Sequence, residues 1–248
     1  ESVGFKRGKF TPVVFHREAD ETRLVVHGDD FTFLGYPDVL EQLLAEMTVW
    51  WDVKLRGIVG SAAGDDREIT ILNRILTWDG AELTLRADPK HQREIIAAFG
   101  LEKGSRGITI PVDKEHVAEG GDDERLEGEE VTRFRGLAAR ANYLGLDRCD
   151  IQYATKEICR CMARPTRGGM RRMKRLARYL LEAPEGVIRY SSDVEDLGRI
   201  MVYVDSDWAG CKSTRKSTSG GAITWGSGLV KSWSRTQGCM ALSSGEAE

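Results

Sequence analysis

The chain of 248 residues predicts an α+β protein, because strand patterns and helix patterns occupy separate blocks of the sequence. Apolar and polar side chains alternate in the strand manner over residues 22–35 and 67–88, and a segment with helical spacing follows each block. From residue 199 the period of two returns in successive segments, with no helical connection between them. Strands joined in this way predict an antiparallel meander.

The composition is that of a globular protein, with 41% hydrophobic and 30% charged residues. No apolar run approaches the roughly 20 residues that a membrane helix needs. The five cysteines are odd in number and lack the paired spacing of a zinc site, so we expect reduced thiols in an intracellular protein. Because the chain opens with Glu1 and shows no signal-peptide pattern, we expect it to be a piece of a longer protein.

The first strand block predicts a hairpin and then a helix. The segments "TRLVV" and "FTFLG" flank "HGDD", in which Gly28 and Asp29 tolerate the positive φ of a tight turn. Asp38 is the predicted N-cap of the helix that follows. Its apolar residues recur at helical spacing and are Val39, Leu40, Leu43, Leu44 and Met47.

The second block predicts two strands over residues 67–88, joined at Asp79-Gly80, and then a helix that Pro89 opens and Gly100 closes. An acidic stretch follows. Residues 113–130 hold nine acids against two bases and almost no apolar side chain, which predicts a solvated linker.

Three helical patterns follow the linker. The first is "RFRGLAARANYLG", and the second begins after Asp150, its predicted N-cap. The third, "MRRMKRLARYLLE", is amphipathic and ends at Pro184 and Gly186. Its predicted buried face consists of Met170, Met173, Leu176, Ala177, Leu180 and Leu181.

The last block predicts a strand in "RIMVYVDSDWAG", with Asp205 and Asp207 on the same side, and a hairpin around Gly226-Ser227-Gly228. The final segment, "GCMALSSGEAE", predicts a short strand and then the first turn of a helix. Ser243 and Glu246 have the spacing of a capping box, so the second terminal acid, Glu248, needs another explanation.

Two pairs of acids are candidate metal ligands. Asp29 and Asp30 lie together at a hairpin tip, and Asp205 and Glu248 come from a strand and a helix start. Each pair has a simpler interpretation, as a polar turn or as solvated surface acids. The functional interpretation is Mg²⁺ binding, since hard cations prefer carboxylate oxygens and phosphoryl transfer uses two such ions.

Basic residues gather in one region, although the net charge is −3. Residues 156–178 hold nine bases against one acid, which is typical either of a solvated helix face or of a surface that contacts phosphates. The loop "KSTRKSTSG" adds cations among hydroxyl groups. The candidate nucleic-acid-binding residues are Arg171, Arg172, Lys174, Arg175, Arg178, Lys212, Arg215 and Lys216.

Taken in order, these segments resemble the Pol polyprotein of copia-type long-terminal-repeat retrotransposons. The most specific are "DSDWAGCKSTRKSTSG" and "SWSRTQGCMALSSGEAE"; "RFRGLAARANYLGLDRCDIQYA" and "LVVHGDDFTFLG" also match the family pattern. The resemblance implies a partial reverse-transcriptase palm-type sheet with helices, a helical connection, and the first strands of a ribonuclease H-like mixed α/β sheet. It assigns residues 1–112 to the end of the reverse transcriptase (palm and thumb), 113–131 to the acidic linker, 132–190 to the connection and 191–248 to a truncated ribonuclease H.

The resemblance also implies roles for the acids. Asp29 and Asp30 fall on the polymerase Y-V-D-D turn, and Asp205 and Glu248 fall on the first two ribonuclease H carboxylates. All four would bind Mg²⁺, or Mn²⁺ in its place. His27 and Gly28 depart from the family's usual Tyr and small apolar residue, which puts the packing of the primer end in doubt.

The implied function is RNA-directed DNA polymerisation with cleavage of the RNA strand of RNA–DNA hybrids. The implied partners are template–primer or hybrid nucleic acid, deoxynucleoside triphosphates in the complete enzyme, and the remaining polyprotein segments, with no membrane. The implied location is the cytoplasm, a virus-like particle or the nucleus. We expect this chain alone to be inactive, because it lacks the upstream and downstream acids of both sites. The alternative is a non-catalytic, nucleic-acid-binding remnant of a decayed or repurposed element.

Overall fold

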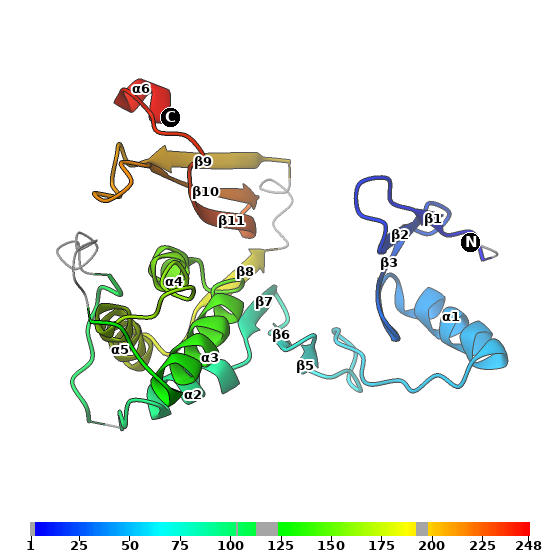
Figure 1. Cartoon of the computed structure of the whole chain (residues 1–248). Coiled ribbons are helices and arrows are strands. Elements are labelled where there is room, and N and C mark those ends of the chain that lie inside the picture. The colour runs from blue at the N-terminus through cyan, green and yellow to red at the C-terminus, as the bar shows by residue number, and fades with distance from the viewer. Residues whose placement is uncertain (1–2, 103, 113–123, 192–197) are drawn as a thin grey trace. The chain divides into compact units, whose positions relative to one another are not determined.

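The computed structural model describes residues 3–102, 104–112, 124–191 and 198–248. It is a mixed α+β structure with antiparallel sheets, which confirms the predicted fold class at that level (Figure 1). The chain divides into two compact units, Glu1–Arg56 and Gly57–Glu248, which are described separately. The four functional segments with boundaries at 112, 131 and 190 stay a prediction. None of the helices in the described ranges has the length and apolar character that a membrane crossing requires.

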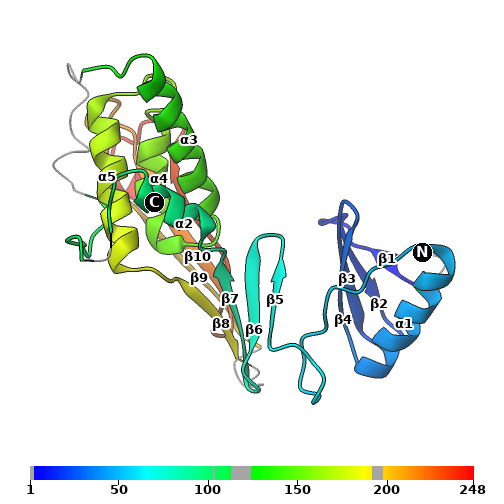
Figure 2. The same cartoon turned by 90° about the horizontal axis from the view of Figure 1, so that it is seen from below.

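The smaller unit is a four-stranded antiparallel sheet with one helix. Its strands pair in chain order and are β1 (Lys6–Arg7), β2 (Val14–Arg17), β3 (Thr22–His27) and β4 (Asp30–Leu34), followed by helix α1 (Pro37–Trp50). The predicted hairpin is confirmed, since His27 pairs with Asp30 across a turn in which Gly28 has a φ of 64°. Leu24 of β3 and Leu43 of α1 are buried together, so the helix covers one face of the sheet (Figure 2).

The predicted N-cap Asp38 is wrong. Helix α1 begins at Pro37, and its N-cap is Tyr36, whose side chain makes no capping hydrogen bond. The fixed φ of proline suits the first helical position, where the missing N–H has no partner to lose. Asp38 therefore lies in the first turn, where its charge interacts favourably with the helix dipole.

The larger unit contains a second antiparallel sheet, in which the order of strands is β5 (Glu68–Ile71), β6 (Arg74–Trp78), β7 (Glu82–Ala87) and β8 (Val187–Ser191). Residues 67–88 thus form three strands, and the prediction of two was wrong. The additional turn is Leu72-Asn73, where both residues have positive φ, 51° and 61°. Such turns favour Asn or Gly, and Leu gives no turn signal. The turn at Asp79-Gly80 is confirmed.

The helical layer of this unit includes α2 (Lys90–Ala97), α3 (Glu129–Leu144), the 3-10 turn η2 (Cys149–Ile151), α4 (Gln152–Cys159) and α5 (Arg167–Glu182). The predicted N-cap Asp150 is wrong, because the residue lies inside η2 and α4 is capped by Ile151. Helix α5 starts three residues earlier than the pattern "MRRMKRLARYLLE" indicated. Its start is fixed by Thr166, whose side-chain oxygen accepts a hydrogen bond from the Gly169 N–H.

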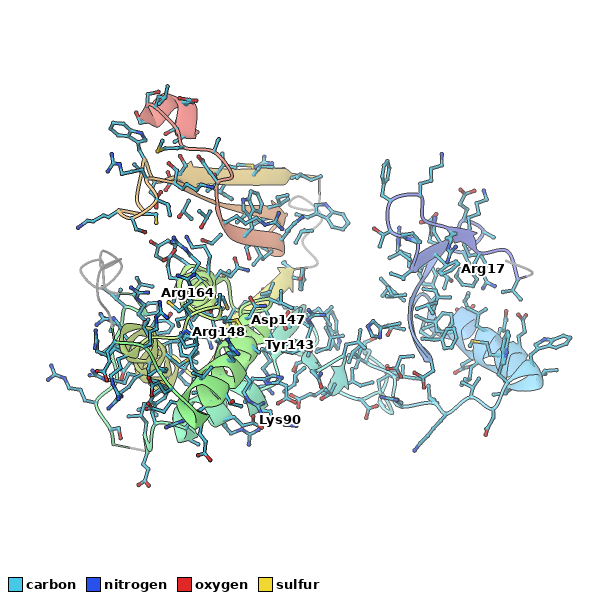
Figure 3. All side chains as sticks on the ribbon, in the orientation of Figure 1. Arg17, Lys90, Tyr143, Asp147, Arg148 and Arg164 are labelled. Carbon is cyan, nitrogen blue, oxygen red and sulfur yellow. The ribbon has the colours of Figure 1, made fainter. Side chains whose placement is uncertain are left out.

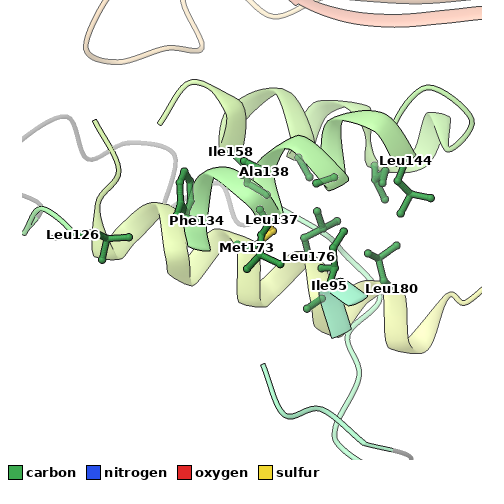
Figure 4. Close-up of a cluster of buried hydrophobic side chains, with 14 residues drawn as sticks. Ile95, Leu126, Phe134, Leu137, Ala138, Leu144, Ile158, Met173, Leu176 and Leu180 are labelled. Carbon is green, nitrogen blue, oxygen red and sulfur yellow. The ribbon is translucent and has the colours of Figure 1, made fainter. Parts of the chain in front are cut away.

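The helices enclose the main hydrophobic core (Figure 4). Phe134, Ile158, Met173 and Leu180 are at most 1% exposed, so the predicted apolar face of α5 is confirmed at its centre. Leu126 also belongs to this core, although it lies in the stretch predicted to be a solvated linker. Glu129 and Glu130 of the same stretch already belong to the first turn of α3, so the predicted linker does not extend to residue 130. Residues 113–123 lie outside the described residues.

A buried arginine, Arg148, connects several helical segments of the larger unit and is labelled in Figure 3. Arg148 is 2% exposed and donates two hydrogen bonds to the Asp150 carboxylate, at 2.9 and 2.7 Å. It also donates to the Ala183 carbonyl at 3.0 Å, at the end of α5. Burial would raise the pKa of Asp150, but the guanidinium of Arg148 holds that pKa below its usual value.

The third sheet is the predicted meander, with β9 (Ile200–Ser206), β10 (Thr218–Trp225) and β11 (Gly228–Thr236) in the order β11-β10-β9. The hairpin at Gly226-Ser227 is confirmed. The prediction of a short strand after this hairpin was wrong. Residues 237–243 form no strand and lead directly to α6 (Ser244–Ala247). Strand β10 begins at Thr218, which pairs with Thr236, so the chain beyond Thr236 has no further residue of β10 to pair with.

Truncation of a core aromatic residue tests the helical core. Phe134→Ala should lower the free energy of unfolding of the larger unit by about 3–5 kcal/mol, because it removes a ring that is 0% exposed. Phe10→Ala is the matched control, since Phe10 is 99% exposed. Urea unfolding followed by circular dichroism measures both variants, and equal losses in the two would contradict the described core.

Candidate functional site

Asp29 and Asp30 lie where the sequence predicted, at the tip of the β3–β4 hairpin. Asp29 is exposed, whereas Asp30 is half-buried and forms an ion pair with Arg56, whose Nη2 lies 3.0 Å from Oδ1 of Asp30. One carboxylate of the pair is thus open to solvent, and the other is partly neutralised by a cation of the same unit.

Asp205 and Glu248 come from two elements of the larger unit. Asp205 lies on β9, opposite Gly220 of β10, and Glu248 follows the last residue of α6. The side chain of Gln237 donates hydrogen bonds both to Ser219 Oγ, at 2.8 Å, and to the Ala247 carbonyl, at 2.5 Å. Ser219 precedes Gly220, the residue that pairs with Asp205, and Ala247 precedes Glu248. Gln237 therefore holds the end of α6 near the part of the sheet that carries Asp205.

The N-cap predicted at the final helix forms, but the Glu246 side chain reaches back to Leu242 and not to the cap residue Ser243. Ser243 Oγ accepts a hydrogen bond from the Glu246 N–H at 3.1 Å, and the Glu246 carboxylate accepts one from the Leu242 N–H at 2.7 Å. Glu246 is therefore used for capping, and Glu248 is exposed and free of that task. Asp207 also has a structural task, since its carboxylate accepts a hydrogen bond from the Thr218 N–H at 2.6 Å.

The carboxylates present fit a loosely held cation. No group of three or more His, Cys, Asp or Glu side chains within the described ranges is arranged to hold a metal ion. Mg²⁺ is nevertheless commonly bound by one or two carboxylates together with waters and substrate phosphates. The pairs Asp29–Asp30 and Asp205–Glu248 match that pattern in chemistry, and neither forms a closed protein cage.

The basic residues of α5 lie along one side of the helix, away from its buried face. Arg171 and Lys174 are exposed, and Arg172, Arg175 and Arg178 are half-buried. These five cations line one side of a pocket of about 200 Å³, whose apolar lining residues include Pro111, Val112, Ala154 and Ile158. The sequence-predicted cations of α5 are thus brought together on one surface.

The predicted cations of the loop after β9 have different environments. Lys212 and Arg215 are exposed, and Arg215 has a φ of 58°. Lys216 is half-buried and donates a hydrogen bond to the Gly238 carbonyl at 2.7 Å, so this side chain supports the loop that leads to α6.

Sequence reasoning missed a charged cluster that links α4 to the β9–β11 sheet. Glu157 is buried and forms ion pairs with Lys156, at 2.7 Å, and with Arg160, at 3.1 Å. Lys156 Nζ also donates to Thr218 Oγ1 at 2.7 Å, and Arg160 Nη2 lies 2.9 Å from the sulfur of Cys211. In the sequence these cations are part of the basic run, and only the fold shows that they bind Glu157.

The thiol of Cys211, which lies in this cluster, has a lowered pKa. Burial would raise its pKa, but hydrogen bonds from Arg160, Ser213 and Thr214 outweigh burial and lower the pKa to about 6. All five cysteines are free, as predicted.

The fold and the site together define a mixed α+β protein that combines two sets of candidate carboxylates with a basic helical surface. Among known proteins, the chain is 36% identical over 118 residues to an uncharacterized mitochondrial protein of Arabidopsis thaliana, AtMg00810. The aligned region covers 46% of this chain and 47% of that relative. It is also similar to the retrovirus-related Pol polyproteins from transposons RE1 and RE2 of Arabidopsis thaliana, at 33% and 31% identity over 118 residues. No family model and no solved structure matches the chain.

These matches confirm the predicted resemblance to the Pol polyproteins of copia-type retrotransposons. Each of the two Pol matches covers 47% of this chain and 8% of the polyprotein. The chain therefore spans about half the length of one relative and a small part of the two others.

The pH dependence of Cys211 alkylation tests the charged cluster. With the pKa lowered to about 6, the rate for Cys211 should rise around pH 6 and reach a plateau below pH 8, measured by mass spectrometry of iodoacetamide-treated protein. Because the folded pKa lies below the unfolded value, the thiolate should stabilise the fold fully above about pH 9 and lose that contribution as the pH falls through about 6.

The matched variant for this test is Arg160→Gln, which removes the donor to the Cys211 sulfur. It should move the alkylation profile of Cys211 to higher pH and leave that of the exposed Cys239 unchanged. An unchanged Cys211 profile in Arg160→Gln would show that the arginine does not set the pKa.

Proposed function

We propose that the chain is part of a retrotransposon Pol polyprotein that copies RNA into DNA and cleaves the RNA strand of the hybrid. The observation that carries this proposal is the similarity to two proteins named as retrovirus-related Pol polyproteins, at 31–33% identity over 118 residues. The proposal includes the function and the substrates of the whole polyprotein. It also includes an intracellular location, in the cytoplasm, a virus-like particle or the nucleus.

In this proposal the smaller unit is the end of a reverse-transcriptase palm, and the β9–β11 sheet with α6 is the beginning of a ribonuclease H-like domain. The hairpin that presents Asp29 and Asp30 supports the first assignment. The antiparallel meander that leads to a capped helix start with Glu248 supports the second.

The two carboxylate pairs would hold Mg²⁺, or Mn²⁺, together with phosphate oxygens of the substrate. Bound metal would supply charge stabilisation and an activated oxygen nucleophile for phosphoryl transfer. Asp205 and Glu248 would act as ligands on the hydrolytic side, and Asp29 and Asp30 on the polymerising side, where deoxynucleoside triphosphates enter the complete enzyme.

The basic surface of α5 would contact the backbone of a template–primer or an RNA–DNA hybrid. Its five cations line one pocket, and the apolar face of the helix that carries them is anchored in the core, so the cations extend from a fixed helix. Contacts of this kind bind polyanions without reading their sequence.

The alternative is a non-catalytic remnant that keeps the basic surface and has lost the chemistry. Two observations favour it: Asp30 is ion-paired with Arg56, and the described residues include no group of three potential metal ligands. In a catalytic polyprotein, other segments would supply the carboxylates that complete each site.

Removal of two exposed charges from α5 should weaken hybrid binding in a salt-dependent way. We expect Arg171→Gln/Lys174→Gln to reduce the slope of log K against log salt by about 1.8, since each lost phosphate contact removes about 0.9. Fluorescence anisotropy with a labelled RNA–DNA hybrid between about 50 and 200 mM salt measures this slope.

The matched control is Lys90→Gln/Arg93→Gln, which removes two exposed cations from α2 of the same unit. It should leave the slope within error of the unmodified chain. Equal effects of the two double variants would show that binding follows net charge and not the α5 surface.

The isolated chain should show no turnover in either reaction. We expect neither Mg²⁺-dependent primer extension nor hybrid cleavage, because two carboxylates do not form a complete two-metal site. Product analysis on sequencing gels, with Asp205→Asn as the blank for hybrid cleavage, measures this. Cleavage that depends on Asp205 would disprove the expectation of inactivity and would also rule out the non-catalytic alternative.

A further inference from the structure

One face of the β9–β11 sheet carries an aromatic pocket that the proposed function does not use. The pocket has a volume of about 310 Å³ and is centred on β10 and β11. Its described lining residues are Ser219, Ile223, Lys231, Trp233, Arg235, Thr236 and Gln237.

The register of the strands places these side chains in three rows. Ile223 pairs with Lys231, Gly221 with Trp233, and Ser219 with Arg235, so all six residues share one face of the sheet. Asp205 pairs with Gly220 and therefore belongs to the opposite face. The aromatic pocket therefore lies on the face opposite Asp205, and two of its lining residues, Ser219 and Gln237, hold the end of α6 next to Glu248.

Gly221 determines how the indole lies. A Cβ at position 221 would collide with the ring atoms of Trp233, so the ring extends across the sheet over the backbone of the neighbouring strand. Glycine inside a strand often marks such a close approach. The Trp233 ring is half-buried, and it lines the pocket.

The charges around the ring favour an anionic ligand. Lys231 and Arg235 are two residues before and after Trp233, both are exposed, and no carboxylate is among the described lining residues. An aromatic face between two cations matches single-stranded nucleic acid, in which bases stack on aromatic rings while phosphates contact Lys and Arg. An apolar polypeptide partner would not account for the two flanking cations.

We propose that this face binds single-stranded nucleic acid, with one base stacked on Trp233 and the adjacent phosphates bound by Lys231 and Arg235. Stacking on an indole is tolerant of sequence, since every base has a π face. The site is independent of the α5 surface, which holds cations and lacks an aromatic residue among its described lining.

The test uses the full chain and a labelled oligothymidylate of about 12 nucleotides, with binding measured by fluorescence anisotropy. Trp233→Leu should weaken binding about tenfold, and Trp233→Phe should retain most of the affinity, because phenylalanine also stacks. Trp50→Leu, which removes an indole that is 75% exposed in the smaller unit, should have no effect.

An abasic oligonucleotide of the same length separates stacking from charge. Trp233→Leu should bind it as well as the unmodified chain does, whereas Lys231→Gln/Arg235→Gln should weaken binding to both oligonucleotides. The double variant should also reduce the salt slope for the oligothymidylate by about 1.4, as expected for two contacts to a single strand.

Photocross-linking with bromouracil in the oligonucleotide should map to Trp233 by mass spectrometry. Unchanged oligothymidylate affinity in Trp233→Leu, or a cross-link confined to α5, would overturn the proposal, and circular dichroism of each variant establishes that it is folded. If binding to hybrid through α5 fails while oligothymidylate binding depends on Trp233, the proposed function is affected and this inference stands.

Discussion

The larger unit depends on the buried guanidinium of Arg148. It pairs with Asp150 and donates hydrogen bonds to the Gln92 side chain on α2 and to the carbonyl of Ala183, the C-cap of α5. Gly186 packs against it so closely that a Cβ would collide with the arginine side chain. Loss of the Asp150 carboxylate would leave the buried guanidinium without its charged partner, which destabilises the fold even though the carboxylate itself is partly exposed. The arginine therefore fixes the path from α5 into β8, the edge strand that pairs with β7.

Two further polar contacts connect this body to the candidate sites. The buried Glu157 with its cations, Lys156 and Arg160, links α4 to Thr218 and Cys211 at the start of the β10 region. Gln237 then links β10 to the end of α6. Each contact satisfies groups that would be costly to bury alone, so the position of the carboxylates follows from hydrogen bonding between elements and not from the local strand.

Much of the fold could be predicted from periodicity and turn chemistry. The β3–β4 hairpin, the meander of β9 to β11 and the apolar face of α5 all follow from patterns that act over a few residues. The turn at Leu72-Asn73 could not be predicted, because leucine adopts positive φ only where the surrounding sheet enforces it. Asp38 and Asp150 were misassigned as caps for a related reason, since proline and a buried arginine decided where those helices begin and what the carboxylate binds.

The sequence by itself determined the main hairpins, the apolar face of α5, the resemblance to Pol polyproteins and the acids and bases that are candidates for chemistry. It also separated Glu246 from Glu248, because a capping box depends only on residues three positions apart. Only the tertiary structure decided which cations are structural, that Cys211 has an acidic thiol, and that Trp233 lies between two cations over Gly221. Those properties depend on side chains from different elements, and the distances between such side chains are set by packing, which no local pattern records.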